Sequence, residues 1–134
     1  MGLLSDMAAG SERRLIAARA VVGDAELRER CAALPPLPRL RLSAAGFDLI
    51  AELKLRSPAL GDLSAQTMDP VARLRGYAEA GAAICSILTE PSRFDGDLAH
   101  LRQAATTLAP YGVPAMRKDS LVDPYQVLEP RANG

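Results

Sequence analysis

The chain has 134 residues, enough for one ordinary domain, and 49% of them are hydrophobic. Its 16 basic and 16 acidic residues cancel to zero net charge, and aromatic residues make up only 4%. This composition gives no support for a nucleic-acid or membrane partner. No apolar run reaches the roughly 18 residues of a membrane span, and the N-terminal stretch lacks a signal-peptide core. A cytoplasmic location is therefore expected.

Two cysteines and one histidine narrow the chemistry further. Cys31 and Cys85 are far apart and lack metal-ligand spacing, so two free buried thiols and no metal site are expected. His100 lies in a Leu/Ala-rich helical pattern and is interpreted as a surface or hydrogen-bonded helix residue.

The N-terminal third is predicted to be helical. "SERRLIAARAVV" (11–22) and "AELRERCAAL" (25–34) carry apolar residues at helical spacing, with a break at Gly23. "PPLP" (35–38) stops the second helix. Residues 1–46 are therefore interpreted as a helical extension followed by a proline-rich linker.

From residue 47 onward, strands and helices alternate. Asp69 and Pro70 suit the start of the first helix of this region, Gly81 suits its end, and Asp123 repeats the cap. Pro130 should kink the last helix or end it early. Strands are predicted at 47–54, 82–89 and 113–119, and helices at 71–80, 97–109 and 125–133.

This β-α-β-α-β-α order indicates an α/β fold with a parallel sheet and right-handed crossovers. Three parallel strands leave two open sheet edges, and a (βα)8 barrel typically needs about 250 residues. Residues 47–134 are thus interpreted as the first three βα units of a TIM barrel, which makes an incomplete barrel. The stop at Gly134, within the last helical pattern, leads us to expect a truncated chain.

Charged side chains end two of these strands. Glu52 and Lys54 are two residues apart, so they share one strand face with Ile50, and that face should point to the barrel interior. Lys118 ends the third strand. The other face of the first strand should pack on the helices, because it is entirely apolar: Leu49, Ala51, Leu53 and Leu55.

Functional residues of parallel α/β folds collect at the carboxyl ends of the strands. Glu52, Lys54 and Lys118 are therefore predicted to converge in one partly desolvated pocket. A lysine whose pKa is lowered there can donate a proton, and paired lysines suit an anionic substrate. The alternative is an internal Glu–Lys ion pair with Lys118 extending to solvent.

Three ordered segments are similar to the motifs of the indole-3-glycerol phosphate synthase family. They are "LIAELKLRSPALG" (49–61), "SILTEPSRFDGDLAHL" (86–101) and "VPAMRKDSLVDPYQVLEPRANG" (113–134). Together they cover about residues 47–134, and residues 1–46 fit the N-terminal extension of that family loosely.

The resemblance implies a TIM-barrel carboxy-lyase of tryptophan biosynthesis that uses no metal or organic cofactor. Its substrate is the anionic phosphosugar 1-(2-carboxyphenylamino)-1-deoxyribulose 5-phosphate, which it converts into indole-3-glycerol phosphate, carbon dioxide and water. Matched residue by residue, Lys118 is the general acid of ring closure, and Lys54 contacts the substrate and joins later proton transfers. Glu52 orients these groups. Ser57 is a loop serine beside the substrate, and Phe94 lines the pocket.

The sequence also departs from the family pattern. Ser120 replaces a phenylalanine that packs on the substrate, Leu55 replaces a common arginine beside Arg56, and Pro130 replaces a common alanine. The second catalytic glutamate, the asparagine after it and the main phosphate loops of the family belong to later strands. The isolated chain is therefore expected to show little or no turnover.

Two other readings remain open. In the first, the chain is a catalytically dead fragment that acts as an interaction or half-barrel assembly module, pairing its open sheet edges with a second copy or another chain. The second, which lacks support in the sequence, is a neighbouring phosphate-sugar barrel such as phosphoribosylanthranilate isomerase. That chemistry would need a Cys/Asp pair near the strand ends, and Cys85 falls in mid-strand, facing the helices.

Overall fold

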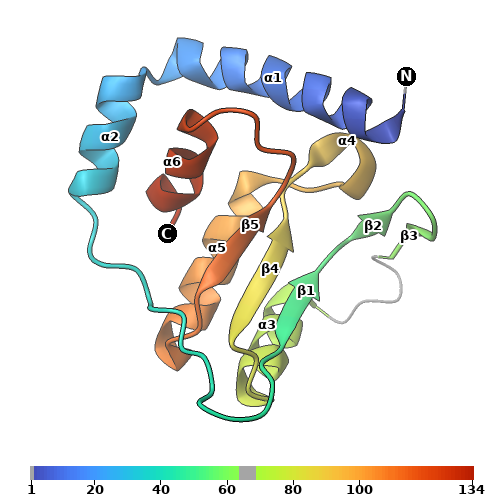
Figure 1. The fold of residues 1–134 in the computed structure, drawn as a ribbon, viewed down its shortest axis with the longest axis vertical. Coiled ribbons are helices and arrows are strands. Elements are labelled where there is room, and N and C mark those ends of the chain that lie inside the picture. Colours follow the sequence, from blue (N-terminus) through green and yellow to red (C-terminus); the bar gives the residue numbers. More distant parts are fainter. Residues whose placement is uncertain (1, 64–68) are drawn as a thin grey trace.

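The computed structural model describes residues 2–63 and 69–134 (Figure 1). The helices are α1 (Leu3–Val21), α2 (Asp24–Ala32), α3 (Pro70–Glu79), α4 (Pro91–Phe94), α5 (Leu98–Leu108), the 3-10 turn η2 (Ala109–Tyr111) and α6 (Tyr125–Ala132). The strands are β1 (Ile50–Leu53), β2 (Arg56–Ser57), β3 (Gly61–Asp62), β4 (Ile84–Leu88) and β5 (Ala115–Lys118). None of the described helices is both long and apolar enough to cross a membrane.

The main sheet has three parallel strands in the order β1-β4-β5, which confirms the predicted α/β fold. In its register Glu52 lies opposite Ser86, and Leu88 lies opposite Lys118. Each strand is shorter than its apolar pattern. The first begins at Ile50, so Leu49 is 58% exposed and the prediction that it packs on the helices is wrong.

The stretch after β1, predicted to be a loop, contains a small antiparallel hairpin. Arg56 pairs with Asp62 and Ser57 with Gly61. Gly61 has a φ of +73°, a conformation that residues other than glycine rarely adopt. A two-residue strand has no apolar periodicity of its own, so the sequence pattern did not reveal the hairpin.

Helices α3 and α5 cover one face of the sheet (Figure 1). Cys85 faces these helices and is fully buried, as predicted, and burial raises the pKa of its thiol. On the opposite face the edge strands expose apolar side chains, with Ile50 62% and Met116 36% exposed, while Ser86 and Leu88 of the central strand are buried. The buried cluster on the helix side comprises Leu53, Leu74, Ala82, Cys85, Ile87, Leu101, Ala104 and Leu108.

Short-range capping explains where α3 begins and ends. The Asp69 carboxylate accepts a hydrogen bond from Ala72 N at 3.0 Å, and Pro70 takes the first helical position. Gly81 follows the helix with a φ of +88°. These features confirm the predicted caps. The caps could be predicted from sequence because each depends only on residues within a few positions.

Helices α1 and α2 pack on α6 rather than standing apart from the sheet-forming region. Leu15, Leu27 and Tyr125 form a second buried cluster there, and the Cys31 thiol donates to Leu128 O at 3.4 Å. Helix α1 begins at Leu3, within the N-terminal third that was predicted to be helical. The division of the chain at residue 46 stays a prediction.

Helix α6 continues past Pro130 to Ala132, so it does not end early at the proline, and the alternative expectation of a kink stays a prediction. Proline lacks the N–H that would bond to the carbonyl four residues earlier, which is that of Gln126. Arg117 Nη1 instead donates to Gln126 O at 2.9 Å. A side chain from β5 therefore satisfies the acceptor that the proline leaves free.

Gly96 lies directly against the end of β4. Its N–H donates to Glu90 O at 2.9 Å. A Cβ at this position would lie 2.6 Å from Leu88 O and 2.7 Å from Glu90 N, and neither backbone atom can turn aside. The loop between β4 and α5 can therefore approach the strand this closely only at a residue without a side chain.

We expect Gly96→Ala to lower the free energy of unfolding by about 1–3 kcal/mol, because overpacking forces the backbone to shift. Gly76→Ala is the matched control: Gly76 is exposed in α3, and nothing lies within 4 Å of the added Cβ. It should raise stability by about 0.5–1 kcal/mol. Urea unfolding measures both variants, and a Gly96→Ala variant as stable as the wild type would contradict the close contact.

Candidate active site

One carboxylate holds two ammonium groups at the carboxyl end of the sheet. Lys54 Nζ lies 3.1 Å from Glu52 Oε1, and Lys118 Nζ lies 2.5 Å from Glu52 Oε2. These are the only two lysines of the chain. The predicted convergence of Glu52, Lys54 and Lys118 is therefore present in the structure.

The sheet itself creates this arrangement. Glu52 belongs to β1 and Lys118 ends β5, with β4 between them. Both side chains lie on the face away from α3 and α5, because Leu53 is in the helix-side core and alternation turns its neighbour outward. Parallel strands bring both ends to one edge.

The electrostatics favour an ionised Glu52. Burial alone would raise the pKa of its carboxyl, but hydrogen bonds and charge from Lys118 and Lys54 outweigh burial and hold that pKa below its usual range. The three groups carry a net charge of +1. The side chains of Lys118 and Lys54 are 55% and 32% exposed, so an anionic ligand can reach them from solvent.

The two other residues of the predicted site, Ser57 and Phe94, make contacts of their own. Ser57 is buried in the β2–β3 hairpin, and its Oγ accepts a hydrogen bond from Ala59 N at 3.3 Å. Phe94 ends α4 and is half-buried. The contacts described for Ser57 and Phe94 do not join them to Glu52, and their substrate-binding roles stay predictions.

The departures from the family pattern also have local partners. Ser120 is half-buried, and its backbone N–H donates to Asp119 Oδ1 at 2.8 Å. Arg56, a candidate replacement for the arginine missing at Leu55, is exposed and lies 3.5 Å from Asp95. Its guanidinium is therefore directed toward α4.

A second cluster of charges at this end of the sheet was missed from the sequence. Arg117 is 5% exposed at its side chain and pairs with Asp119 at 3.1 Å and Glu129 at 2.8 Å. Arg14 of α1 joins the cluster through Asp119 and Glu90. The available signal was an acidic residue at or just after the end of two predicted strands, in "SILTE" and "AMRKD".

The ionised Glu52 should contribute to stability in a pH-dependent way. Its folded-state pKa is depressed, so this contribution is present above the unfolded-state pKa and is lost as the pH falls through the folded-state pKa. We expect Glu52→Gln to be less stable than the wild type at neutral pH, with the gap closing in acid. Urea unfolding across pH tests this.

Glu12→Gln is the control for that experiment, because Glu12 is an exposed carboxylate on α1. It should show little difference from the wild type at any pH. A Glu52→Gln gap that does not change with pH would contradict the ion-pair interpretation.

Comparison with known proteins places the chain in a family. The chain is 43% identical to an indole-3-glycerol phosphate synthase of Nocardioides sp. and 40% identical to that of Arthrobacter sp., over its full length in both cases. It is 39% identical to the protein of that name from Saccharopolyspora erythraea, again over the full chain. The chain spans about half the length of these curated relatives, 51%, 50% and 49%. The family model for indole-3-glycerol phosphate synthase matches residues 7–134, and the chain belongs to that family.

Proposed function

We propose that Glu52, Lys54 and Lys118 form part of the active site of an indole-3-glycerol phosphate synthase. The reaction would close the indole ring of 1-(2-carboxyphenylamino)-1-deoxyribulose 5-phosphate and release carbon dioxide and water. The observation that carries this proposal is the single Glu52 carboxylate with two lysine ammonium groups at 3.1 and 2.5 Å. Family membership supports it, because the range matched by the family model, residues 7–134, includes these three residues.

Lys118 suits the role of general acid. Ring closure forms a bond to the carbonyl carbon of the substrate, and a proton delivered to the carbonyl oxygen makes that carbon more electrophilic. The Lys118 side chain is 55% exposed, so its ammonium can exchange Glu52 for a bound ligand. Lys54, which directly follows β1 and pairs with Glu52 two residues earlier, would contact the substrate and serve the later proton transfers.

The charge of the site also fits its proposed substrate. A carboxylate and a phosphate make that substrate anionic, and two ammonium groups against one carboxylate leave an excess positive charge. The substrate carries an aromatic ring as well. In this chain Ser120 stands where the family has the phenylalanine that packs on that ring, so apolar contact is reduced.

A second candidate function rests on the face of the sheet away from α3 and α5. Ile50 and Met116 are 62% and 36% exposed there, on strands whose outer edges are unpaired among the described residues. A second copy or another chain would cover this face, and the chain would then act as an assembly module. Turnover that depends on Lys118 would distinguish an enzymatic function from an assembly function.

We expect Lys118→Ala to reduce turnover by about 10²–10⁴-fold, the usual contribution of a general acid. The assay follows indole fluorescence for the chain alone and for a chimera that adds the remaining half of the Nocardioides relative. Lys118→Arg is the matched control. It keeps the positive charge but cannot release a proton, so it should lose as much activity as Lys118→Ala.

A folded chimera whose turnover survives Lys118→Ala would overturn the role of Lys118. Turnover by the unmodified chain alone would show that copies complete a site by self-association. No turnover in a folded chimera would favour the assembly module.

We also expect Ser120→Phe to improve substrate binding in the same chimera by about 0.5–1.5 kcal/mol, because the ring restores an aromatic contact. The Michaelis constant should fall, while Ser120→Ala should leave it nearly unchanged. A Ser120→Phe variant that binds substrate no better would mean that other apolar groups already cover the ring.

A further inference from the structure

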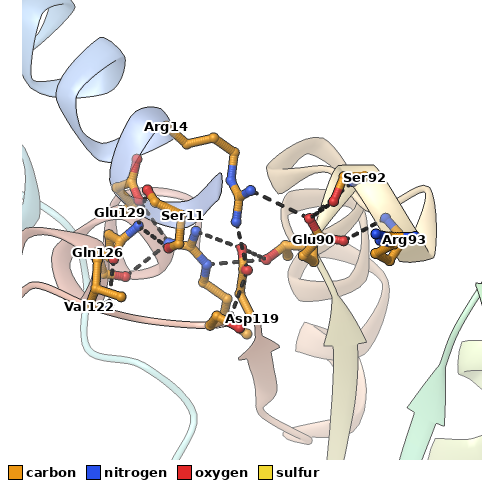
Figure 2. A network of polar contacts seen from close by, with 12 residues as sticks. Ser11, Arg14, Glu90, Ser92, Arg93, Asp119, Val122, Gln126 and Glu129 are labelled. Atoms are coloured by element: carbon orange, nitrogen blue, oxygen red, sulfur yellow. Dashed lines mark hydrogen bonds and ion pairs between the residues drawn. The ribbon is translucent and has the colours of Figure 1, made fainter. Parts of the chain in front are cut away.

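Helix α1 crosses the carboxyl ends of β4 and β5 (Figure 1), and one of its side chains contacts both strand ends. Arg14 Nη2 donates to Asp119 Oδ1 at 2.8 Å, and its Nη1 lies 3.5 Å from Glu90 Oε1 (Figure 2). Glu90 follows β4 by two residues, and Asp119 directly follows β5. The guanidinium therefore bridges two neighbouring strands just beyond their last residues.

The two carboxylates that Arg14 contacts are buried, with side-chain exposures of 1% for Glu90 and 0% for Asp119. Glu90 accepts hydrogen bonds from Ser92 N and Arg93 N, at 3.0 and 2.7 Å, and so caps α4. Burial alone would raise the pKa of Glu90, but the bonds from Ser92 and Arg93 and the charge of Arg14 hold it below its usual range.

Charge balance makes Arg14 important to this cluster. Arg14 and Arg117 face three carboxylates, those of Glu90, Asp119 and Glu129. Without Arg14, one arginine would face three buried or nearly buried negative charges. An uncompensated buried charge is costly, so the ends of β4 and β5 would be expected to move apart or admit water.

The contact of Lys118 with Glu52 depends on the Arg14 bridge between the ends of β4 and β5 more than the contact of Lys54 does. The backbone ladder between β4 and β5 ends with Thr89 N donating to Lys118 O at 3.0 Å, immediately before Asp119. Lys118 must reach across β4 to contact Glu52. Lys54 contacts Glu52 within its own stretch of chain and needs no fixed spacing between strands.

We propose that Arg14 is a positioning residue, which holds the ends of β4 and β5 together so that Lys118 reaches Glu52. Its importance for catalysis rests on the proposed function, but its effect on the lysine–carboxylate pair does not. Helix α1 would thus be a working part of the site, although none of its residues touches Glu52 or the lysines among the contacts described.

Other contacts keep α1 in place when Arg14 is changed. Arg19 binds Asp123 at 2.8 Å, and Gln126 Nε2 donates to Ser11 Oγ at 2.8 Å. Leu15 is buried in the cluster with Tyr125. Substitution of Arg14 should therefore loosen the strand ends without releasing the helix.

The test uses the fact that the chain has only two lysines. Isotopic labelling of lysine side chains gives two NMR signals, assigned with Lys54→Arg and Lys118→Arg. Glu52→Gln defines the positions of both signals when the carboxylate is lost. We expect Arg14→Ala to move the Lys118 signal most of the way to its position in Glu52→Gln, and to leave the Lys54 signal almost unchanged.

Two further variants complete the design. Arg13→Ala is the matched control, since Arg13 is exposed on the same helix and forms no ion pair with any described residue. It should move neither signal. Arg14→Lys replaces the forked guanidinium, which bridged two carboxylates, with a single ammonium, so the Lys118 signal should return only part of the way to its wild-type position. This variant also serves as the test if Arg14→Ala does not fold.

An unchanged Lys118 signal in a folded Arg14→Ala or Arg14→Lys variant would overturn the proposal. Equal movement of both lysine signals would also overturn it, because it would indicate a general loss of structure. Neither result depends on turnover, so the proposal can fail while the proposed enzymatic function holds, and the reverse is equally possible.

Discussion

The parallel register of β1, β4 and β5 is the constraint on which the rest of this structure depends. Parallel strands end at one edge, so Glu52 on the first strand and Lys118 on the third meet there although they are 66 positions apart in sequence. The same geometry leaves charged residues just beyond the ends of β4 and β5. Both the candidate site and the cluster beside it follow from this one arrangement.

The charges at the strand ends are stabilised in two different ways. On the face away from α3 and α5, Glu52 is partly exposed and forms ion pairs with two lysines that are themselves partly exposed to solvent. On the helix side, Asp119 is fully buried and requires two arginines, one from β5 and one from α1. Partial exposure leaves the first group free to rearrange around a ligand, whereas burial makes the second group rigid.

The Arg117 side chain bonds to several acceptors at once. It neutralises Asp119 and Glu129, and it donates to the Gln126 carbonyl that Pro130 leaves without a helical partner. The proline is therefore tolerated inside α6 because a buried donor lies within reach. The N-terminal helices are joined to the same region, since α1 supplies the second arginine and α2 packs on α6.

The sequence by itself determined the α/β order, the caps at Asp69 and Gly81, the helix-facing position of Cys85 and the convergence of Glu52 with the lysines. Each follows from periodicity, from neighbours within a few residues, or from the rule that parallel strands end together. Only the tertiary structure decided the docking of α1, the exposure of Leu49, the β2–β3 hairpin and the partners of Arg117. Those outcomes rest on contacts between distant segments, or on strands too short to carry a pattern, and no local periodicity encodes them.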